Sequence, residues 1–71
     1  MASYFIAKWL VLTGRRLDAA HRLIAEGMAL SETAMRVGFA DQSHMTRAFK
    51  ARFGLTPGRF RALVAAGAET R

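Results

Sequence analysis

The fold is decided by residues 31–53, SETAMRVGFADQSHMTRAFKARF, in which one glycine separates two helix-like runs. Ser31 can cap a first short helix, and Gly38 can end it after two turns. Asp41 can then cap a second helix, which we place at residues 42–53. The stretch therefore predicts two helices joined by a tight turn.

Small and apolar residues at this turn predict how the two helices meet. Ala34 has a small side chain that lets the helices approach closely, and Gly38 can adopt a positive φ at little cost. Phe39 is then expected to fill the angle between the helices. Thr33 and Val37 are expected to face inward with Ala34. The second helix is left with a polar, basic outer face.

A long helix is expected before this stretch, from Tyr4 to Glu26, with Gly27 as the left-handed residue after its end. Gly14 would weaken this helix by about 1 kcal/mol relative to alanine, which allows a kink or break there. The apolar stripe of the helix is expected to comprise Leu10, Leu17, Ala20, Leu23 and Ile24.

A fourth helix has clear start signals. Thr56 can cap it, Pro57 suits its first position, and Leu55 can pack on Phe60 as a hydrophobic staple. The helix should end near Gly67. The sequence thus predicts an all-α, homeodomain-like domain of about four helices. The inner edge of the third helix should hold Met45, Ala48, Phe49, Arg52 and Phe53. The shared core should comprise Leu17, Ile24, Val37, Phe39, Phe49, Phe53, Phe60 and Leu63.

The composition fits one small domain with a polyanionic partner. The chain has 71 residues, no cysteine and a net charge of +6. Five basic residues and no acid lie between residues 42 and 68, which favours nucleic acid or an anionic membrane surface. His21 and His44 are far apart and have no carboxylate or thiolate at metal-ligand spacing. Ser31, Ser43 and Thr46 have no base arranged to activate them. We therefore expect no metal, no cofactor and no enzymatic activity.

The outer residues of the helix at 42–53 have the chemistry of DNA readers. Arg47 can pair with guanine through two hydrogen bonds, and Gln42 can do so with adenine. Ser43 and His44 can contact bases or phosphates. The expected phosphate contacts are Ser31, Thr46, Lys50, Thr56, Gly58 and Arg59.

These residues also carry a family resemblance. The segments Arg15–Ala20, Gly38–Lys50 and Phe53–Gly58 closely resemble the DNA-binding domain of AraC/XylS-family transcription regulators, and the resemblance extends from about Leu10 to Val64. It implies sequence-specific control of transcription in a bacterial cytoplasm. By resemblance, residues 9–26 form the helix that connects two helix-turn-helix units, and residues 31–53 form the second unit. The positions that match base contacts are Gln42, Ser43 and Arg47, with His44 beside them.

Two departures from the family pattern bear on function. The first helix-turn-helix unit and a ligand-binding domain are not found before residue 9, so we expect no small-molecule effector site in this sequence. Met45 stands where the family usually has an aromatic residue, and methionine is a tolerant core filler. We assign residues 1–14 as an apolar segment that starts the connecting helix, residues 15–66 as the DNA-binding domain, and residues 67–71 as a tail.

Residues 4–12 supply more apolar surface than this small core can hide, so a homodimer through them is expected. The apolar side chains are Tyr4, Phe5, Ile6, Trp9, Leu10, Val11 and Leu12. Two other functions stay open. One is a truncated remnant or protein-interaction module with weak, non-specific DNA affinity. The other is a basic helix protein on a membrane surface, against which the four capped helices argue.

Overall fold

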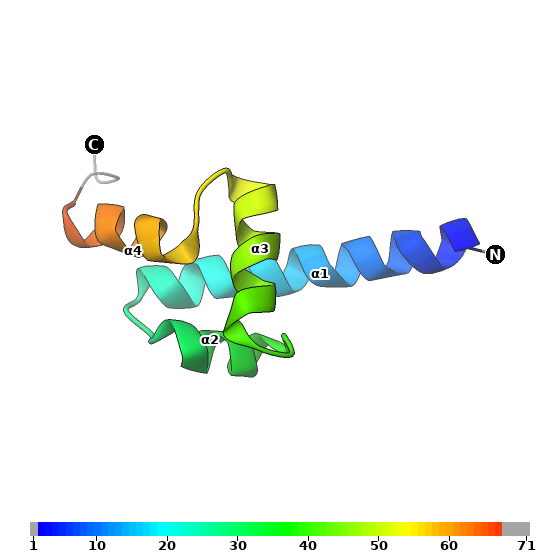
Figure 1. Cartoon of the computed structure of the whole chain (residues 1–71), viewed down its shortest axis with the longest axis horizontal. Coiled ribbons are helices and arrows are strands. Elements are labelled where there is room, and N and C mark those ends of the chain that lie inside the picture. Colours follow the sequence, from blue (N-terminus) through cyan, green and yellow to red (C-terminus); the bar gives the residue numbers. More distant parts are fainter. Residues whose placement is uncertain (1, 68–71) are drawn as a thin grey trace.

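The chain folds into four helices, as Figure 1 shows for the computed structural model. The structure describes the backbone of residues 2–67 and the side chains of residues 8–67. The helices are α1 (Ala2–Ala25), α2 (Leu30–Val37), α3 (Gln42–Phe53) and α4 (Pro57–Ala65). Residues 2–67 contain no strand, so the all-α prediction is confirmed. The observed bounds of α3 are those expected from the sequence.

Helix α1 is a single long helix that runs through Gly14 without a break. The turn-by-turn hydrogen bonding on either side therefore outweighs the modest helix penalty of one glycine. Residues 2–14 extend beyond the other three helices as a projecting arm (Figure 1). A Cβ on Gly14 would lie 3.7 Å from the Arg52 guanidinium, which is ordinary contact. The long helix expected from the sequence is therefore continuous, without the break that Gly14 allowed.

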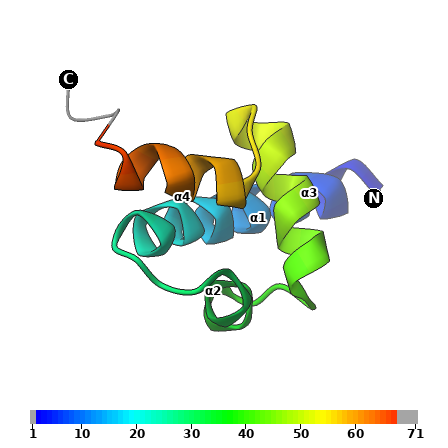
Figure 2. The ribbon, with the colours of Figure 1, turned by 60° about the vertical axis from the view of Figure 1, so that its left-hand side comes forward.

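The C-terminal half of α1 is the common surface against which α2, α3 and α4 pack (Figure 2). Leu17, Ala20 and Ile24 are buried there. The remaining buried apolar residues are Ala34, Phe39, Met45, Phe49 and Phe60. Val37 and Phe53 are half-buried against this core, as are Leu55 and Val64. The core is therefore built around one end of α1.

Two residues expected to be apolar and inward-facing are in fact exposed. Leu63 is 39% exposed and Leu10 is 56% exposed. Leu10 lies on the projecting arm of α1, beyond the part against which the other helices pack. Leu63 lies on α4, where Phe60 and Val64 supply the packed face. The helical spacing of both residues was correct for an apolar stripe, but no other helix among the described residues covers that part of it.

His21 packs among three phenylalanine rings. Its imidazole lies 4.2 Å from the ring of Phe60 and 5.0 Å from that of Phe53, between centroids. Phe49 stacks on it at 6.1 Å. His21 is half-buried, and it joins α1 to both α3 and α4 through aromatic contacts.

The start of α2 differs from the sequence expectation, because Ser31 does not cap it. The N-cap is Ala29, which makes no side-chain cap bond. The helix begins one residue before Ser31, and the Thr33 Oγ1 donates a hydrogen bond of 2.8 Å to the Ala29 carbonyl. This bond satisfies a fully buried hydroxyl inside the first turn. Ser31 therefore lies within the helix, exposed to solvent.

Arg52 does not lie on the inner edge of α3. It is exposed, and its Nη2 donates a hydrogen bond of 3.1 Å to Asp18 Oδ1 on α1. Its guanidinium carbon also lies 5.5 Å from the ring centroid of Phe53. A long charged side chain at the edge of a core places its stem on apolar surface and its head in water. Arg52 thus ties the end of α3 to α1 from outside the core.

Candidate nucleic-acid interface

Gly38 and Phe39 set the angle at which α3 leaves α2. Gly38 has φ of 98°, in the left-handed region. The Phe39 N–H donates to the Ala34 carbonyl at 2.9 Å, which closes the turn. Ala34 is 1% exposed and Phe39 is 6% exposed. The burial of Ala34 and Phe39 and the positive φ at Gly38 were expected, and all three are confirmed.

Asp41 and His44 fix the first turn of α3. Asp41 Oδ1 accepts a hydrogen bond of 2.8 Å from the His44 backbone N–H, so the predicted cap is confirmed. The His44 ring lies edge-on to Phe39, with 5.2 Å between centroids and 77° between planes. The ring is half-buried. Part of the His44 side chain therefore serves packing beneath the outer face.

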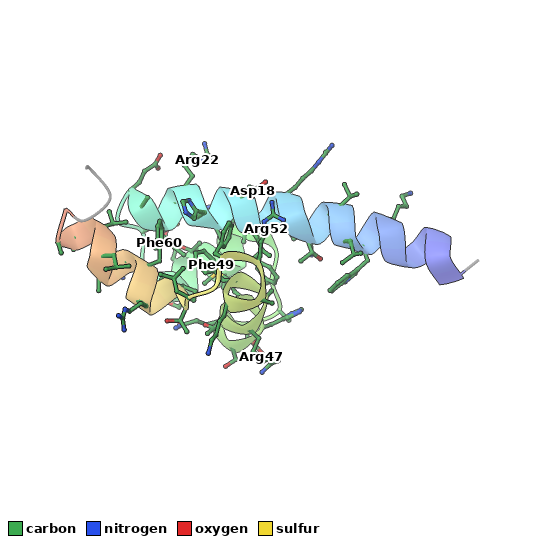
Figure 3. The ribbon with its side chains drawn as sticks, turned by 90° about the horizontal axis from the view of Figure 1, so that it is seen from above. Asp18, Arg22, Arg47, Phe49, Arg52 and Phe60 are labelled. Atoms are coloured by element: carbon green, nitrogen blue, oxygen red, sulfur yellow. The ribbon has the colours of Figure 1, made fainter. Side chains whose placement is uncertain are left out.

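The outer face of α3 presents a polar, open depression. Gln42, Ser43, Thr46 and Arg47 line it, and its volume is about 530 Å³. Gln42 and Thr46 are four positions apart, as are Ser43 and Arg47, so the two pairs form adjacent stripes on one side of the helix. Arg47 projects from α3 on the side away from α1 (Figure 3). Lys50 is also exposed, one turn further on.

The charges of this face are not neutralised by neighbouring acids. Among residues 8–67 the ion pairs are Arg36–Glu32, at 3.8 Å, and Arg52–Asp18, at 3.1 Å. Neither pair involves Arg47 or Lys50. Asp41 caps the helix with its carboxylate. The outer face thus keeps its positive potential for a ligand.

The N-terminus of α4 is a second polar region of the surface. Thr56 Oγ1 accepts a hydrogen bond of 3.2 Å from the Arg59 backbone N–H, so the predicted cap is confirmed. Pro57 is buried at the first helical position, while Gly58 and Arg59 are exposed. The positive end of α4 therefore lies at the surface beside an arginine side chain.

In the part of the chain that the structure describes, no cluster of three or more His, Cys, Asp or Glu side chains has the arrangement of a metal site. No helix within the same residues combines the length and the hydropathy needed to cross a bilayer.

A short helix, a glycine turn and a second helix with a polar outer face define a helix-turn-helix domain. Residues 10–63 match the helix-turn-helix domain family. The chain belongs to this family, in its AraC-type form, and is a DNA-binding module of the kind found in transcription regulators. The family is generally non-enzymatic.

Known relatives support this assignment. The transcriptional activator RhrA of Rhizobium meliloti is 48% identical over 56 residues, which cover 75% of this chain and 18% of RhrA. The virulence regulon transcriptional activator VirF of Yersinia enterocolitica is 39% identical over 51 residues, 70% of this chain and 19% of VirF. The transcriptional regulator ExsA of Pseudomonas aeruginosa is 39% identical over 51 residues, 70% of this chain and 18% of ExsA. The chain thus spans about a fifth of the length of these relatives. No solved structure matches the chain significantly.

Proposed function

We propose that the chain reads a specific DNA sequence by placing α3 in the major groove. The observation that carries the proposal is the grouping of Gln42, Ser43, Thr46 and Arg47 on one open face of the first turns of α3. Recognition helices meet base edges with these first turns. Gln42, Ser43 and Arg47 are proposed as the base contacts, Arg47 to guanine and Gln42 to adenine. His44 contributes through the exposed part of its ring.

A set of polar groups around α3 is proposed to hold the DNA backbone. Thr46 lies next to Arg47 on α3 and Lys50 follows one turn later, while Thr56, Gly58 and Arg59 lie at the start of α4. Ser31 is exposed in the first turn of α2. Phosphate contacts position a protein on the duplex without reading its sequence. These six residues thus set the register of α3 on the DNA.

The resemblance to AraC/XylS-family DNA-binding domains also suggests the place of this domain in a regulator. We propose that residues 15–66 are the second of two helix-turn-helix units and that α1 is the helix connecting the units. Residues 1–14 are proposed as the start of that helix and residues 67–71 as a tail, most of which lies outside the described residues. A bacterial regulator of this type acts in the cytoplasm, where the chromosome is.

The proposal is tested by removing one base contact and one phosphate contact. Arg47→Ala should cost about 1–3 kcal/mol on a site selected from a random duplex pool and should relax preference at one base pair. Lys50→Ala should weaken specific and random duplexes alike and flatten the salt dependence by about one unit. Arg61→Ala, which removes an exposed arginine from α4, is the matched control. Titration of the selected site and of random duplex, followed by fluorescence anisotropy at several salt concentrations, gives the affinity of each of the three variants.

Equal loss on specific and random DNA for Arg47→Ala would make Arg47 a phosphate contact. A parent chain that shows no sequence preference would instead leave a module with weak, non-specific DNA affinity.

Self-association is proposed as a second part of the function. Trp9, Leu10, Val11 and Leu12 are between 48% and 59% exposed on the arm of α1. These four consecutive residues place apolar surface around the arm, and large exposed apolar surface is seldom left in water. A symmetric dimer through residues 4–12 would cover them and would present two recognition helices to DNA. The side chains of Tyr4, Phe5 and Ile6, which belong to the same prediction, lie outside the described residues.

Sedimentation at micromolar concentration tests the dimer. The parent chain should sediment as a dimer, and Trp9→Glu should sediment as a monomer with unchanged helicity. A monomeric parent would overturn the dimer.

A further inference from the structure

A second surface gathers positive charge away from the outer face of α3. An open groove of about 390 Å³ lies between α1 and the end of α2. Four of the eleven basic residues of the chain line it: Arg15, Arg16, Arg22 and Arg36. The groove plays no part in the DNA contacts proposed above.

The floor of this groove, the arginine groove, is apolar. Ala19 and Leu23 come from α1, and Val37 comes from α2. All three are half-buried. Arg15, Ala19, Arg22 and Leu23 form one stripe of α1, because positions spaced by four, seven and eight share a helix face. The arginine groove therefore combines a narrow apolar floor with a cationic rim.

Most of the rim charge is uncompensated. Glu32 faces Arg36 at 3.8 Å, and both side chains of this pair are largely exposed. Asp18, the acid nearest in sequence to Arg15, is held by Arg52 instead. Within residues 8–67 no acid forms an ion pair with Arg15 or with Arg22. Guanidinium groups in such an arrangement favour carboxylates, to which they can donate two parallel hydrogen bonds.

The Arg22 edge of the arginine groove lies on the opposite side of the molecule from Arg47. Arg22 projects from α1 at one edge of the molecule, whereas Arg47 projects from α3 at the opposite edge (Figure 3). A duplex held by Arg47 would leave the side of Arg22 open. A sugar-phosphate backbone would also leave the apolar floor without a partner, because protein contacts to it are mainly hydrogen bonds and charge. The groove thus fits a ligand that is both acidic and apolar.

We propose that the arginine groove binds an acidic amphipathic helix of a partner protein. The apolar side chains of that helix would lie on Leu23 and Val37, and its carboxylates would pair with the arginines of the rim. An amphipathic helix in a groove is a common mode of peptide recognition, and complementary charge gives it specificity. The domain would then hold DNA on one side and a protein on the other.

The experiment uses the whole chain and a fluorescein-labelled peptide of about 18 residues, or about five helical turns. In the probe, leucine and glutamate alternate at helical spacing, and a matched peptide has glutamine in place of glutamate. Fluorescence anisotropy should show saturable binding of the glutamate peptide that weakens as salt is added. Arg15→Gln/Arg22→Gln should weaken it about three- to tenfold, since two exposed pairs are lost. Arg61→Gln should leave it nearly unchanged.

Amide chemical shifts of the parent chain locate the peptide without any substitution. They should change in residues 15–23 and 36–37 and stay constant in residues 42–47. Thermal melting of each variant checks that it folds. No DNA is present in the peptide titration or the chemical-shift measurement, so these two results do not depend on whether the chain reads DNA.

Three results would overturn the proposal. The first is no saturable binding of the glutamate peptide up to about 1 mM. The second is equal binding of the glutamine peptide, which would make the contact merely hydrophobic. The third is a greater loss of affinity for random duplex DNA than for the peptide in Arg15→Gln/Arg22→Gln, which would make the groove a nucleic-acid contact.

Discussion

The two halves of α1 are both rich in apolar residues, but only one half is covered. In the C-terminal half, Leu17, Ala20 and Ile24 are at most 3% exposed. In the N-terminal half, Trp9 and Val11 are 55% and 59% exposed. The covered half meets three helices that follow it in the chain, while the arm projects beyond them. An apolar helix face thus indicates that a partner is needed, without indicating where the partner comes from.

The largest expected difference in stability comes from replacing one aromatic residue in each region with alanine. Phe49 is fully buried against the covered half, so Phe49→Ala should cost about 3–5 kcal/mol of unfolding free energy. Trp9→Ala on the arm should change the unfolding free energy by no more than about 0.5 kcal/mol in the monomer. Urea denaturation followed by circular dichroism, at a concentration where the chain is monomeric, measures both. A Phe49→Ala chain as stable as its parent would break the core assignment.

A smaller effect is expected at the turns of the covered part. Gly38 and Gly27 both have positive φ, 98° and 103°, so alanine at either should cost about 1–2 kcal/mol. A Cβ on Gly38 would lie 3.2 Å from Arg16 Nε, whereas one on Gly27 would meet nothing within 4 Å. Because the Arg16 side chain is flexible, the two losses should be similar in thermal denaturation. A much larger loss for Gly38→Ala would show that Arg16 is rigidly held.

Gly14 lies where the arm joins the covered half. Replacing it with alanine should raise the stability of the chain, whereas the same change at Gly38 or Gly27 lowers it. The backbone of Gly14 is helical, and its Cβ would make only ordinary contact with Arg52. Gly14→Ala should therefore stabilise the chain by about 1 kcal/mol. An increase in the urea midpoint at constant slope would confirm it. A decrease would mean that Arg52 needs the space beside Gly14.

The smallest effect concerns the ion pair that joins α1 to α3. The side chains of Arg52 and Asp18 are 46% and 61% exposed, so Asp18→Asn should cost about 0.2–1 kcal/mol. The loss should shrink further at high salt. Glu32→Gln removes a similarly exposed pair within one helix and is the control. A salt-independent loss would indicate packing, not charge, as the contribution of Asp18.

Local signals predicted the ends of the helices well. Asp41, Thr56 and Gly38 each act through backbone groups a few residues away, and each does in the structure what its residue type favours. Ser31 is the exception, because α2 begins at Leu30 with Ala29 as its N-cap, which places Ser31 inside the first turn. The buried Thr33 hydroxyl in the same turn donates to the Ala29 carbonyl, and which residue of this turn is buried depends on the helices that pack against it.

Which side chains are buried was harder to predict. Leu63 and Leu10 have the spacing of core residues, but burial depends on where neighbouring helices end. His21 gave no signal in the sequence, because the three phenylalanines around it come from two other helices. The outer face of α3 was predictable as a group, since helical spacing alone places Gln42, Ser43 and Arg47 together. Their contacts with DNA stay a prediction.

The short connections between the helices have a consequence for the speed of folding. Three or four residues separate each helix from the next, and chains whose contacts are local fold quickly. The contact between His21 on α1 and Phe60 on α4 is different. It closes a loop of about 40 residues, with an entropic cost that grows with the logarithm of loop length. We therefore expect docking of α4 onto α1, more than the formation of any single helix, to limit the rate at which the chain reaches its native state.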